Sequence, residues 1–140
     1  MSPVPTRQSG ATVDLSPRVF STATVVASPA ASSETIIASL TISQDLAFGL
    51  GVVLLGYAAF TAGTSGVSAN LKLRQTDASG STLKASGLVT VAAASLYDRS
   101  IVALDTGPTL PGQVYVMTLT IGSGAAASTV SALSLIALVI

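Results

Sequence analysis

The stretch from Gln113 to Ile121, QVYVMTLTI, indicates the fold class of this chain more clearly than any other. Its side chains alternate between two sets, which point to opposite faces of an extended backbone. One set is Tyr115, Met117, Leu119 and Ile121, and the other is Val114, Val116, Thr118 and Thr120. Valine, isoleucine, threonine and tyrosine are favoured in strands. The stretch therefore predicts a β-strand.

Similar apolar runs fill the chain from Glu34 onward, with clusters of Gly and Ser between them. The predicted strands are Thr35–Ile42, Val52–Phe60, Ala69–Gln75, Leu88–Ala93, Ser100–Leu104, Gln113–Ile121 and Thr129–Ile140, with a minor strand near Ser81–Lys84. Asp77–Gly80 (DASG) has the composition of a hairpin loop, and Gly107–Gly112 (GPTLPG) that of a longer loop.

The order of these runs predicts an all-β chain without a convincing helix. Alternation within Ala69–Gln75 places Leu71 and Leu73 inward and the two cations, Lys72 and Arg74, outward. About seven or eight short antiparallel strands predict a single β-sandwich or jelly-roll domain over residues 34–140. The pattern does not distinguish these two architectures, because both use the same kind of strand.

Residues 1–33 differ from the rest, since they carry Pro3, Pro5, Pro17 and Pro29. Proline is excluded from helix interiors and from central strands. Only Val19 to Val26 could form a short edge strand. We expect an extended N-terminal arm, and two interpretations of it stay open. It is either a frayed terminus or a segment that becomes ordered on a neighbouring subunit.

The composition argues against several classes of protein. Hydrophobic residues make up 49% of the chain and charged residues 9%, the net charge is zero, and His, Cys and Trp are absent. Without Cys there is no disulfide or thiolate metal site, and without His the commonest general base and zinc ligand are missing. Zero net charge argues against a nucleic-acid partner. We expect no cofactor and no metal.

No arrangement of side chains indicates catalysis, so we expect that the chain is not an enzyme. The acidic residues are dispersed along the chain: Asp14, Glu34, Asp45, Asp77, Asp98 and Asp105. A serine nucleophile needs a base, and the two lysines, Lys72 and Lys84, are expected on solvated strand faces. Asp98 and Arg99 are expected to form a turn with a local ion pair.

The three tyrosines, Tyr57, Tyr97 and Tyr115, are candidates for a sugar-binding platform. However, Tyr57 and Tyr115 lie within apolar strands, which favours packing in the core with a bonded hydroxyl. Tyr115, three residues after Gly112, also fits a turn like the tyrosine corner of β-sandwiches.

Two long tracts carry no charge, from Leu46 to Leu71 and from Thr106 to Ile140. Because large exposed apolar patches promote association, these tracts suit surfaces covered by another subunit, a larger assembly or a lipid bilayer. Leu46 to Ala62 is the candidate membrane helix, but it is shorter than the roughly 20 residues that a spanning helix needs. It also contains three glycines and lacks a positive flank. We therefore expect no membrane contact and keep a small integral membrane protein as an alternative.

The last predicted strand is apolar on both faces, which is typical of a central strand or a subunit interface. We expect subunit contacts from the arm and from this strand. The candidate interface residues are Val19, Phe20, Val25, Val26, Leu133, Leu135, Ile136, Leu138 and Ile140.

Residues 35–140 have a recognisable sequence pattern. They contain GVVLLGYAAFTAGTSG, the charged hairpin LKLRQTDASGSTLKASG, then LPGQVYVMTLTIGSG and STVSALSLIALVI. This pattern resembles the sequences of the head decoration (cement) proteins of tailed bacteriophages. It also resembles those of the trimeric jelly-roll modules related to the tumour-necrosis-factor and C1q folds. Aromatic residues are scarcer than in C1q-like domains, and the proline-bearing arm is not part of that fold.

The resemblance implies a structural virion protein. It implies a homotrimer on the outer surface of the capsid, where it binds across neighbouring subunits of the major capsid protein and stabilises the head. The alternative is another β-rich virion component, such as a minor capsid protein, a head fibre or a glycan- or receptor-binding module.

Overall fold

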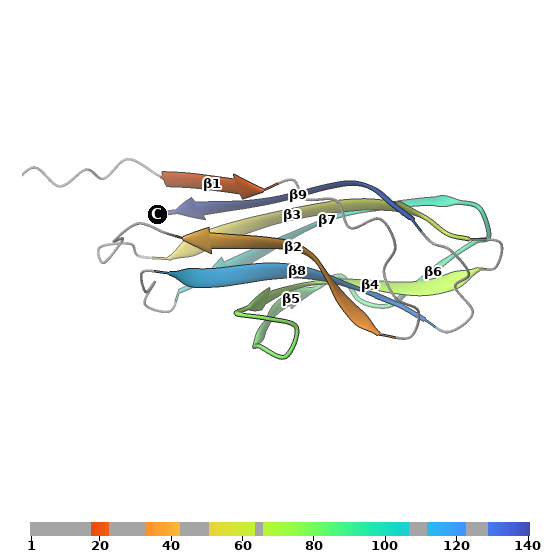
Figure 1. The fold of residues 1–140 in the computed structure, drawn as a ribbon, viewed down its shortest axis with the longest axis horizontal. Coiled ribbons are helices and arrows are strands. Elements are labelled where there is room, and N and C mark those ends of the chain that lie inside the picture. The colour runs from red at the N-terminus through yellow and green to blue at the C-terminus, as the bar shows by residue number, and fades with distance from the viewer. Residues whose placement is uncertain (1–17, 23–32, 43–50, 64–65, 107–111, 123–128) are drawn as a thin grey trace, which may run out of the picture.

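The computed structural model describes residues 18–22, 33–42, 51–63, 66–106, 112–122 and 129–140. Within these ranges every regular element is a strand, and the strands form two layered sheets (Figure 1). All strand pairs are antiparallel. The predicted all-β sandwich is therefore confirmed.

Each sheet has a simple strand order. Sheet A contains, in order, β1 (Arg18–Thr22), β9 (Thr129–Val139), β3 (Val52–Thr61) and β7 (Leu96–Asp105). Sheet B contains, in order, β2 (Glu34–Ile42), β8 (Gln113–Ile121), β4 (Val67–Gln75) and β5 (Thr82–Ala85). A further strand, β6 (Val89–Val91), pairs with the first residues of β4.

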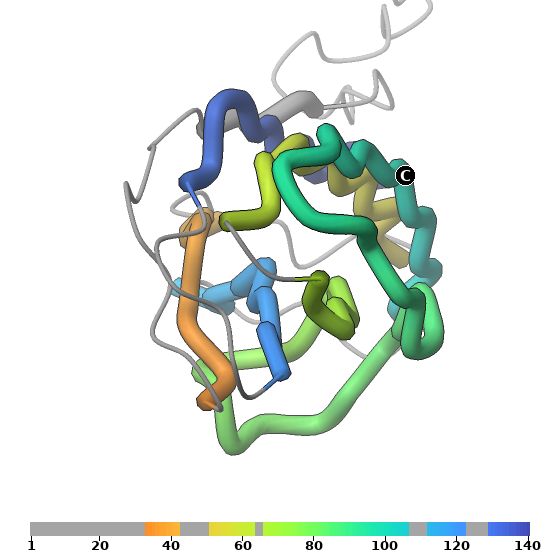
Figure 2. The backbone as a smooth tube through the Cα atoms, turned by 90° about the vertical axis from the view of Figure 1, so that its right-hand side faces the viewer, coloured from red at the N-terminus to blue at the C-terminus, as the bar shows by residue number. Residues whose placement is uncertain are grey.

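The strand order identifies the architecture as a jelly roll. The chain passes from sheet to sheet as it goes from β1 to β4, remains in sheet B for the hairpin β4–β5, and later returns through β7, β8 and β9. Figure 2 shows deep-blue β9 in the upper layer and orange β2 with light-blue β8 in the lower one. Two four-stranded sheets connected in this way form the jelly roll, with β6 as an addition.

The core lies between the sheets, and its residues follow the predicted alternation. Tyr115, Met117, Leu119 and Ile121 of β8 are fully buried. In β4, Leu71 and Leu73 are also fully buried, while Lys72 and Arg74 lie on the outer face. A period of two turns one set of side chains into the core. In β8 the other set is not all exposed, because Val116 and Thr118, on the opposite face of the strand, are also buried.

The strand β7 is longer than predicted. Its ten residues pair with the whole of β3, from Val52 opposite Asp105 to Thr61 opposite Leu96. Asp98 and Arg99 therefore lie inside a strand, and the expected turn at this point is wrong. Pairing with a long central strand outweighs the weak strand preference of these two polar residues.

Part of the expected N-terminal arm belongs to the sheet. Arg18–Thr22 pairs with β9 from Arg18 opposite Val139 to Thr22 opposite Leu135, and forms one edge of sheet A. This strand falls within the predicted Val19–Val26 segment. Residues 1–17 and 23–32, with Val25 and Val26, lie outside the described residues.

The candidate membrane segment also has a place in the fold. Of Leu46 to Ala62, Val52–Thr61 is β3, which lies between β9 and β7 in sheet A. Residues 43–50 are not among those that the structure describes. No helix in the described ranges is both long and apolar enough to cross a membrane.

Candidate interaction surface

The last strand, β9, has its two faces in different surroundings. Leu133 and Leu135 are buried between the sheets, so these two candidate interface residues belong to the core. Ile136 and Leu138 alternate with them and lie half-buried on the outer face of sheet A. Ile140, at the end of the chain, is exposed. The backbone of Val19 and Phe20 lies in β1, and the structure does not describe their side chains.

Registers across sheet A bring apolar side chains together on its outer face. Residues directly opposite in antiparallel strands share a face. Three such rows cross β9, β3 and β7: Leu138–Val53–Leu104, Ile136–Leu55–Val102 and Ser134–Tyr57–Ser100. We call these nine residues the apolar face. Seven of the nine are apolar or aromatic, two are serine, and none carries a charge.

Large side chains of the apolar face lie open to solvent. The exposed fraction is 41% for Leu55, 54% for Val102 and 57% for Leu104. Exposed apolar area costs about 25 cal/mol per Å² relative to burial, and a contiguous apolar patch on a folded protein marks a site of interaction. The apolar face is therefore the candidate interaction surface of this chain.

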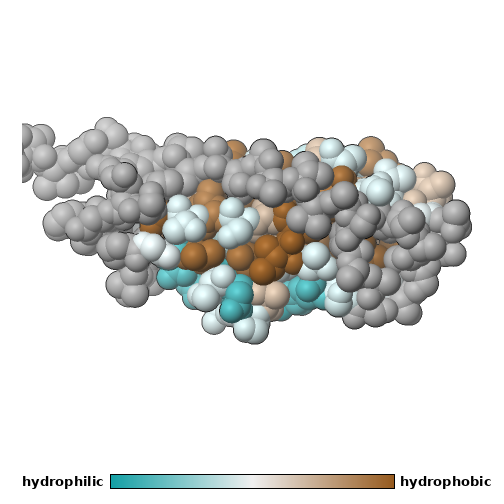
Figure 3. Space-filling model, in the orientation of Figure 1, coloured by the Kyte–Doolittle hydropathy of each residue, from teal (hydrophilic) through white to brown (hydrophobic). Residues whose placement is uncertain are grey.

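The outer face of sheet B has the opposite character, because it carries a network of charges around Glu34. The two carboxylate oxygens of Glu34 accept hydrogen bonds from Arg74 Nε over 2.6 Å and from Arg74 Nη2 over 2.9 Å. Lys72 Nζ lies 3.3 Å from Glu34 Oε2. In Figure 3 the teal, hydrophilic residues lie along the lower part of the molecule, where Figure 1 shows sheet B.

Further hydrogen bonds complete this network. Thr118, which is fully buried beneath it, donates a hydrogen bond to Glu34 Oε1. Arg74 Nη1 donates to the Gly80 carbonyl over 2.8 Å. The hydrogen bond from Arg74 lowers the pKa of Glu34 from 4.5 to about 2, and Thr118 and Lys72 act in the same direction against the effect of burial. Glu34, Lys72 and Arg74 are therefore paired with one another within the chain.

A second polar cluster connects the two sheets at one end of the sandwich. The Tyr115 hydroxyl donates to Asp105 Oδ2 over 2.7 Å, and Gln75 Nε2 donates to the same oxygen over 2.6 Å. Burial, together with the Asp105 carboxylate, raises the pKa of the Tyr115 phenol. The hydroxyl of Tyr115 thus binds a side chain of the facing sheet, whereas a tyrosine corner uses the backbone upstream.

The three tyrosines do not form a platform. Tyr57 lies on the apolar face, so its expected place in the core is wrong, while Tyr115 is buried and bonded as expected. Tyr97 is buried against Phe60, with ring centroids 5.0 Å apart. Arg99 Nε donates to the Tyr97 hydroxyl over 3.3 Å.

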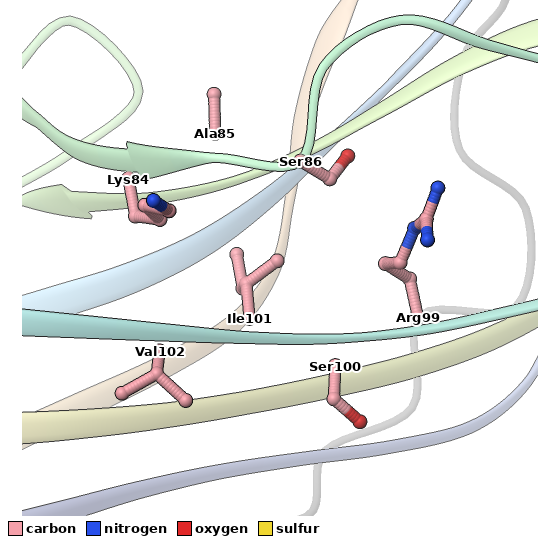
Figure 4. Close-up of a pocket in the computed structure, with 7 residues that line it drawn as sticks. All are labelled: Lys84, Ala85, Ser86, Arg99, Ser100, Ile101 and Val102. Carbon is pink, nitrogen blue, oxygen red and sulfur yellow. The ribbon is translucent and has the colours of Figure 1, made fainter.

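An open groove of about 480 Å³ runs between β5 and β7, at the edges of the two sheets (Figure 4). Lys84 and Ser86 line it from one side, and Arg99 and Ile101 from the other. Ser86 Oγ is already engaged in the fold, since it accepts a hydrogen bond from the Leu71 amide over 3.1 Å. Within the described ranges no three His, Cys, Asp or Glu residues cluster as metal ligands do.

Comparisons with known proteins show likeness of fold. No family model matches the sequence, and no curated protein is similar to it in sequence. A solved structure of the infectious bursal disease virus, Gx strain, is similar with a TM-score of 0.56 and 13% identity, over 89% of this chain and 33% of that one. The T13 viral particle of the same virus gives a TM-score of 0.60 and 14% identity, over 87% of this chain and 31% of the other.

The chain thus spans about a third of the length of these viral particle chains, and at this identity the likeness shows the jelly-roll fold alone. A subunit of Bacillus endospore appendages, a family of disulfide-linked pili, gives a TM-score of 0.47 and 13% identity, over 92% of this chain and 94% of that one.

Proposed function

We propose that this chain is a structural protein of a virus particle, a decoration or cement protein on the outer surface of a phage capsid. It stabilises the shell by binding across neighbouring subunits of the major capsid protein, and it does so as a homotrimer. No catalytic step is part of this role.

The observation that carries the proposal is an uncharged apolar face on the outside of a jelly roll. Jelly rolls recur in viral capsid domains, and the similar folds of the infectious bursal disease virus particle support the same role. An apolar surface built from Leu, Val, Ile and Ser packs against another protein without the cost of removing water from a charge.

Two polar clusters among the described residues are already paired within the fold. Glu34 is held by Lys72 and Arg74, and Asp105 is held by Tyr115 and Gln75. Both clusters connect strands of the fold.

A trimer of such domains that contacts several shell subunits at once gains affinity through its high effective concentration after the first contact.

The direct test is to purify particles from cells that carry an epitope-tagged copy of the chain, and to image them. We expect the tagged chain to sediment with the shell and to form protrusions at regular positions on its outer surface. Particles that lack the chain should lose their contents at a lower temperature than complete ones. A chain that sediments apart from the particles overturns the proposal, and a chain confined to fibres or tails replaces it with another virion role.

A further inference from the structure

We infer that the groove between β5 and β7 binds an extended, acidic segment of a partner protein, which adds as a strand to the free edge of β7. The inference deepens the proposed function, on which it rests for the source of the segment, a subunit of the shell. It assigns this contact to the open side of the sandwich, where the edges of the two sheets meet.

Two cations face the groove from opposite sheets. Lys84 of β5 lies opposite the buried Leu73, so it shares the core-facing side of sheet B. Arg99 of β7 alternates with the buried Tyr97 and Ile101, so it shares the core-facing side of sheet A. Both cations are nevertheless exposed, because the sandwich opens into the groove between these two edge strands (Figure 4).

Neither cation has a carboxylate partner among the described residues. Three of the described acidic side chains are bound elsewhere in the fold: Glu34, Asp77 and Asp105. Asp98 is adjacent to Arg99 in β7, so the two side chains point to opposite faces of the strand. Arg99 donates to the Tyr97 hydroxyl through Nε, and its two terminal nitrogens bind no other described group. The groove therefore presents two positive charges that the described part of the chain does not neutralise.

The chemistry of the two walls selects a carboxylate. Like charges on two sides of one groove repel each other, and an anion placed between them removes that repulsion. The guanidinium of Arg99 offers parallel N–H donors that match the two oxygens of a carboxylate. Ala85 and Ile101 also line the groove and provide apolar contacts. Its volume of about 480 Å³ is within the usual range of ligand sites.

The backbone of β7 selects an extended peptide as the carrier of that carboxylate. β7 is the edge of sheet A and pairs on one side only, with β3. In the described ranges, residues 98–102 make no backbone hydrogen bond beyond this pairing. An edge strand directs alternate N–H and C=O groups away from its sheet, and an added strand supplies both acceptors and donors for them. A phosphate group supplies acceptors, so it would satisfy this edge only in part.

The cations also limit which strand can bind. Charged side chains at a sheet edge oppose pairing with a further strand. Lys84 and Arg99 would repel a basic segment and would lose hydration without compensation beside an uncharged one. An acidic segment alone gains from both cations, so the edge is selective for it.

The probe is a synthetic peptide of alternating Thr and Glu, about eight residues long as strands are, titrated into the isotope-labelled full chain. Thr favours strands, and the alternation places every Glu on one face. Nuclear magnetic resonance follows the backbone amides. We expect the shifts to concentrate in β7 and β5, and the affinity to fall as salt is added.

Matched peptides separate charge from backbone pairing. One carries Gln and one Lys in place of Glu, and a third keeps Glu but carries Pro in place of alternate Thr, which removes backbone donors. We expect each to bind about tenfold more weakly than the Thr–Glu peptide. Free glutamate and inorganic phosphate are titrated as bare anions. If either of them, or any of the matched peptides, binds as tightly as the Thr–Glu peptide, the inference is overturned.

The protein variants test the two cations. Arg99→Gln and Lys84→Gln should each weaken binding of the Thr–Glu peptide by about tenfold, as expected for the loss of a hydrogen bond to a charged group. Arg18→Gln, in β1 at the opposite edge of sheet A, removes the same charge elsewhere and should bind as the wild type does. Circular dichroism checks that each variant keeps its fold. A wild type that shows no binding at millimolar peptide, or groove variants that bind as tightly as Arg18→Gln, would show that the cations only protect the edge.

The outcomes also separate this inference from the proposed function. A chain that sediments with viral shells but does not bind the Thr–Glu peptide overturns the inference and leaves the function standing. A chain that binds the peptide through Lys84 and Arg99 but is missing from particles does the reverse.

Discussion

The Tyr115 hydroxyl lies 2.7 Å from Asp105 Oδ2, and this hydrogen bond joins β8 of sheet B to β7 of sheet A. Gln75 Nε2, at the end of β4, donates to the same oxygen over 2.6 Å. One carboxylate therefore holds three strands from both sheets. Because hydrogen bonds to ionised groups are stronger than those between neutral groups, this cluster fixes the spacing of the sheets at that end.

Removing the hydroxyl of Tyr115 should weaken the fold. Tyr115→Phe keeps the buried ring but leaves Asp105 with one donor fewer, so we expect a loss of about 1.5–3 kcal/mol in the free energy of unfolding. Urea denaturation measures this loss. The control is Tyr57→Phe on the apolar face, which should change the value by less than about 0.5 kcal/mol. Equal effects of the two variants would contradict the role of the hydrogen bond.

The stability of the fold should fall in acid, because Glu34 then becomes protonated. The Arg74 hydrogen bond lowers the pKa of Glu34 to about 2, below its value of 4.5 in the unfolded chain. A lowered carboxyl pKa stabilises the fold fully above the unfolded pKa, and this contribution is lost as the pH falls from about 4.5 to about 2. We expect Glu34→Gln to be less stable than the wild type at neutral pH, with a shallower decline in acid.

The measurement for Glu34 is the urea midpoint over a series of pH values. Asp98→Asn is the matched control, since Asp98 is an exposed carboxylate of β7 with no described ion pair. Its pH profile should parallel that of the wild type. If Glu34→Gln declines in acid as steeply as the wild type does, the network around Glu34 is not the source of the dependence.

Two adjacent leucines of β3 should separate folding from assembly. Leu54 is fully buried between the sheets, while Leu55 is 41% exposed on the apolar face. Leu54→Ala should cost about 2–5 kcal/mol through lost burial and the cavity left behind. Leu55→Ala should change the stability of the dissociated chain by less than about 0.5 kcal/mol, yet raise the protein concentration needed for assembly. Unfolding in dilute solution and light scattering test the two effects, and the reverse ranking would show that the register of β3 is wrong.

Gly56 allows the two sheets to approach each other closely. A β-carbon at this position would lie 3.0 Å from Met117 Sδ and 3.1 Å from a methyl carbon of Leu73, both on sheet B. Gly56→Val should therefore overpack the core and cost about 1–3 kcal/mol. Thermal melts compare it with Ser100→Val on the exposed side of β7, which leaves the core unaltered. If the melting temperature of Gly56→Val is no lower than that of this control, the core accommodates the added side chain without strain.

Sequence reasoning worked best where a strand carries its own alternation. The bounds of Gln113–Ile121 agree with those of β8, and Leu71 and Leu73 point inward as predicted. It failed for Tyr57 and for Leu133, because a strand that is apolar on both sides does not reveal which side faces the other sheet. It also missed the network between Glu34 and Arg74, whose members are 40 residues apart in the chain and carry no local signal.

The amino-acid sequence alone determined the class of this protein. Alternation, turn residues and the scarcity of charge are local properties, and they sufficed to predict an all-β sandwich. The tertiary structure decided the strand order of the jelly roll and the inclusion of β1 in sheet A. It also decided which side of each apolar strand packs between the sheets and which side lies on the outer face of sheet A. These outcomes depend on pairings between distant segments, such as Leu55 with both Val102 and Ile136, whose free energy is gained only when the whole sandwich has formed.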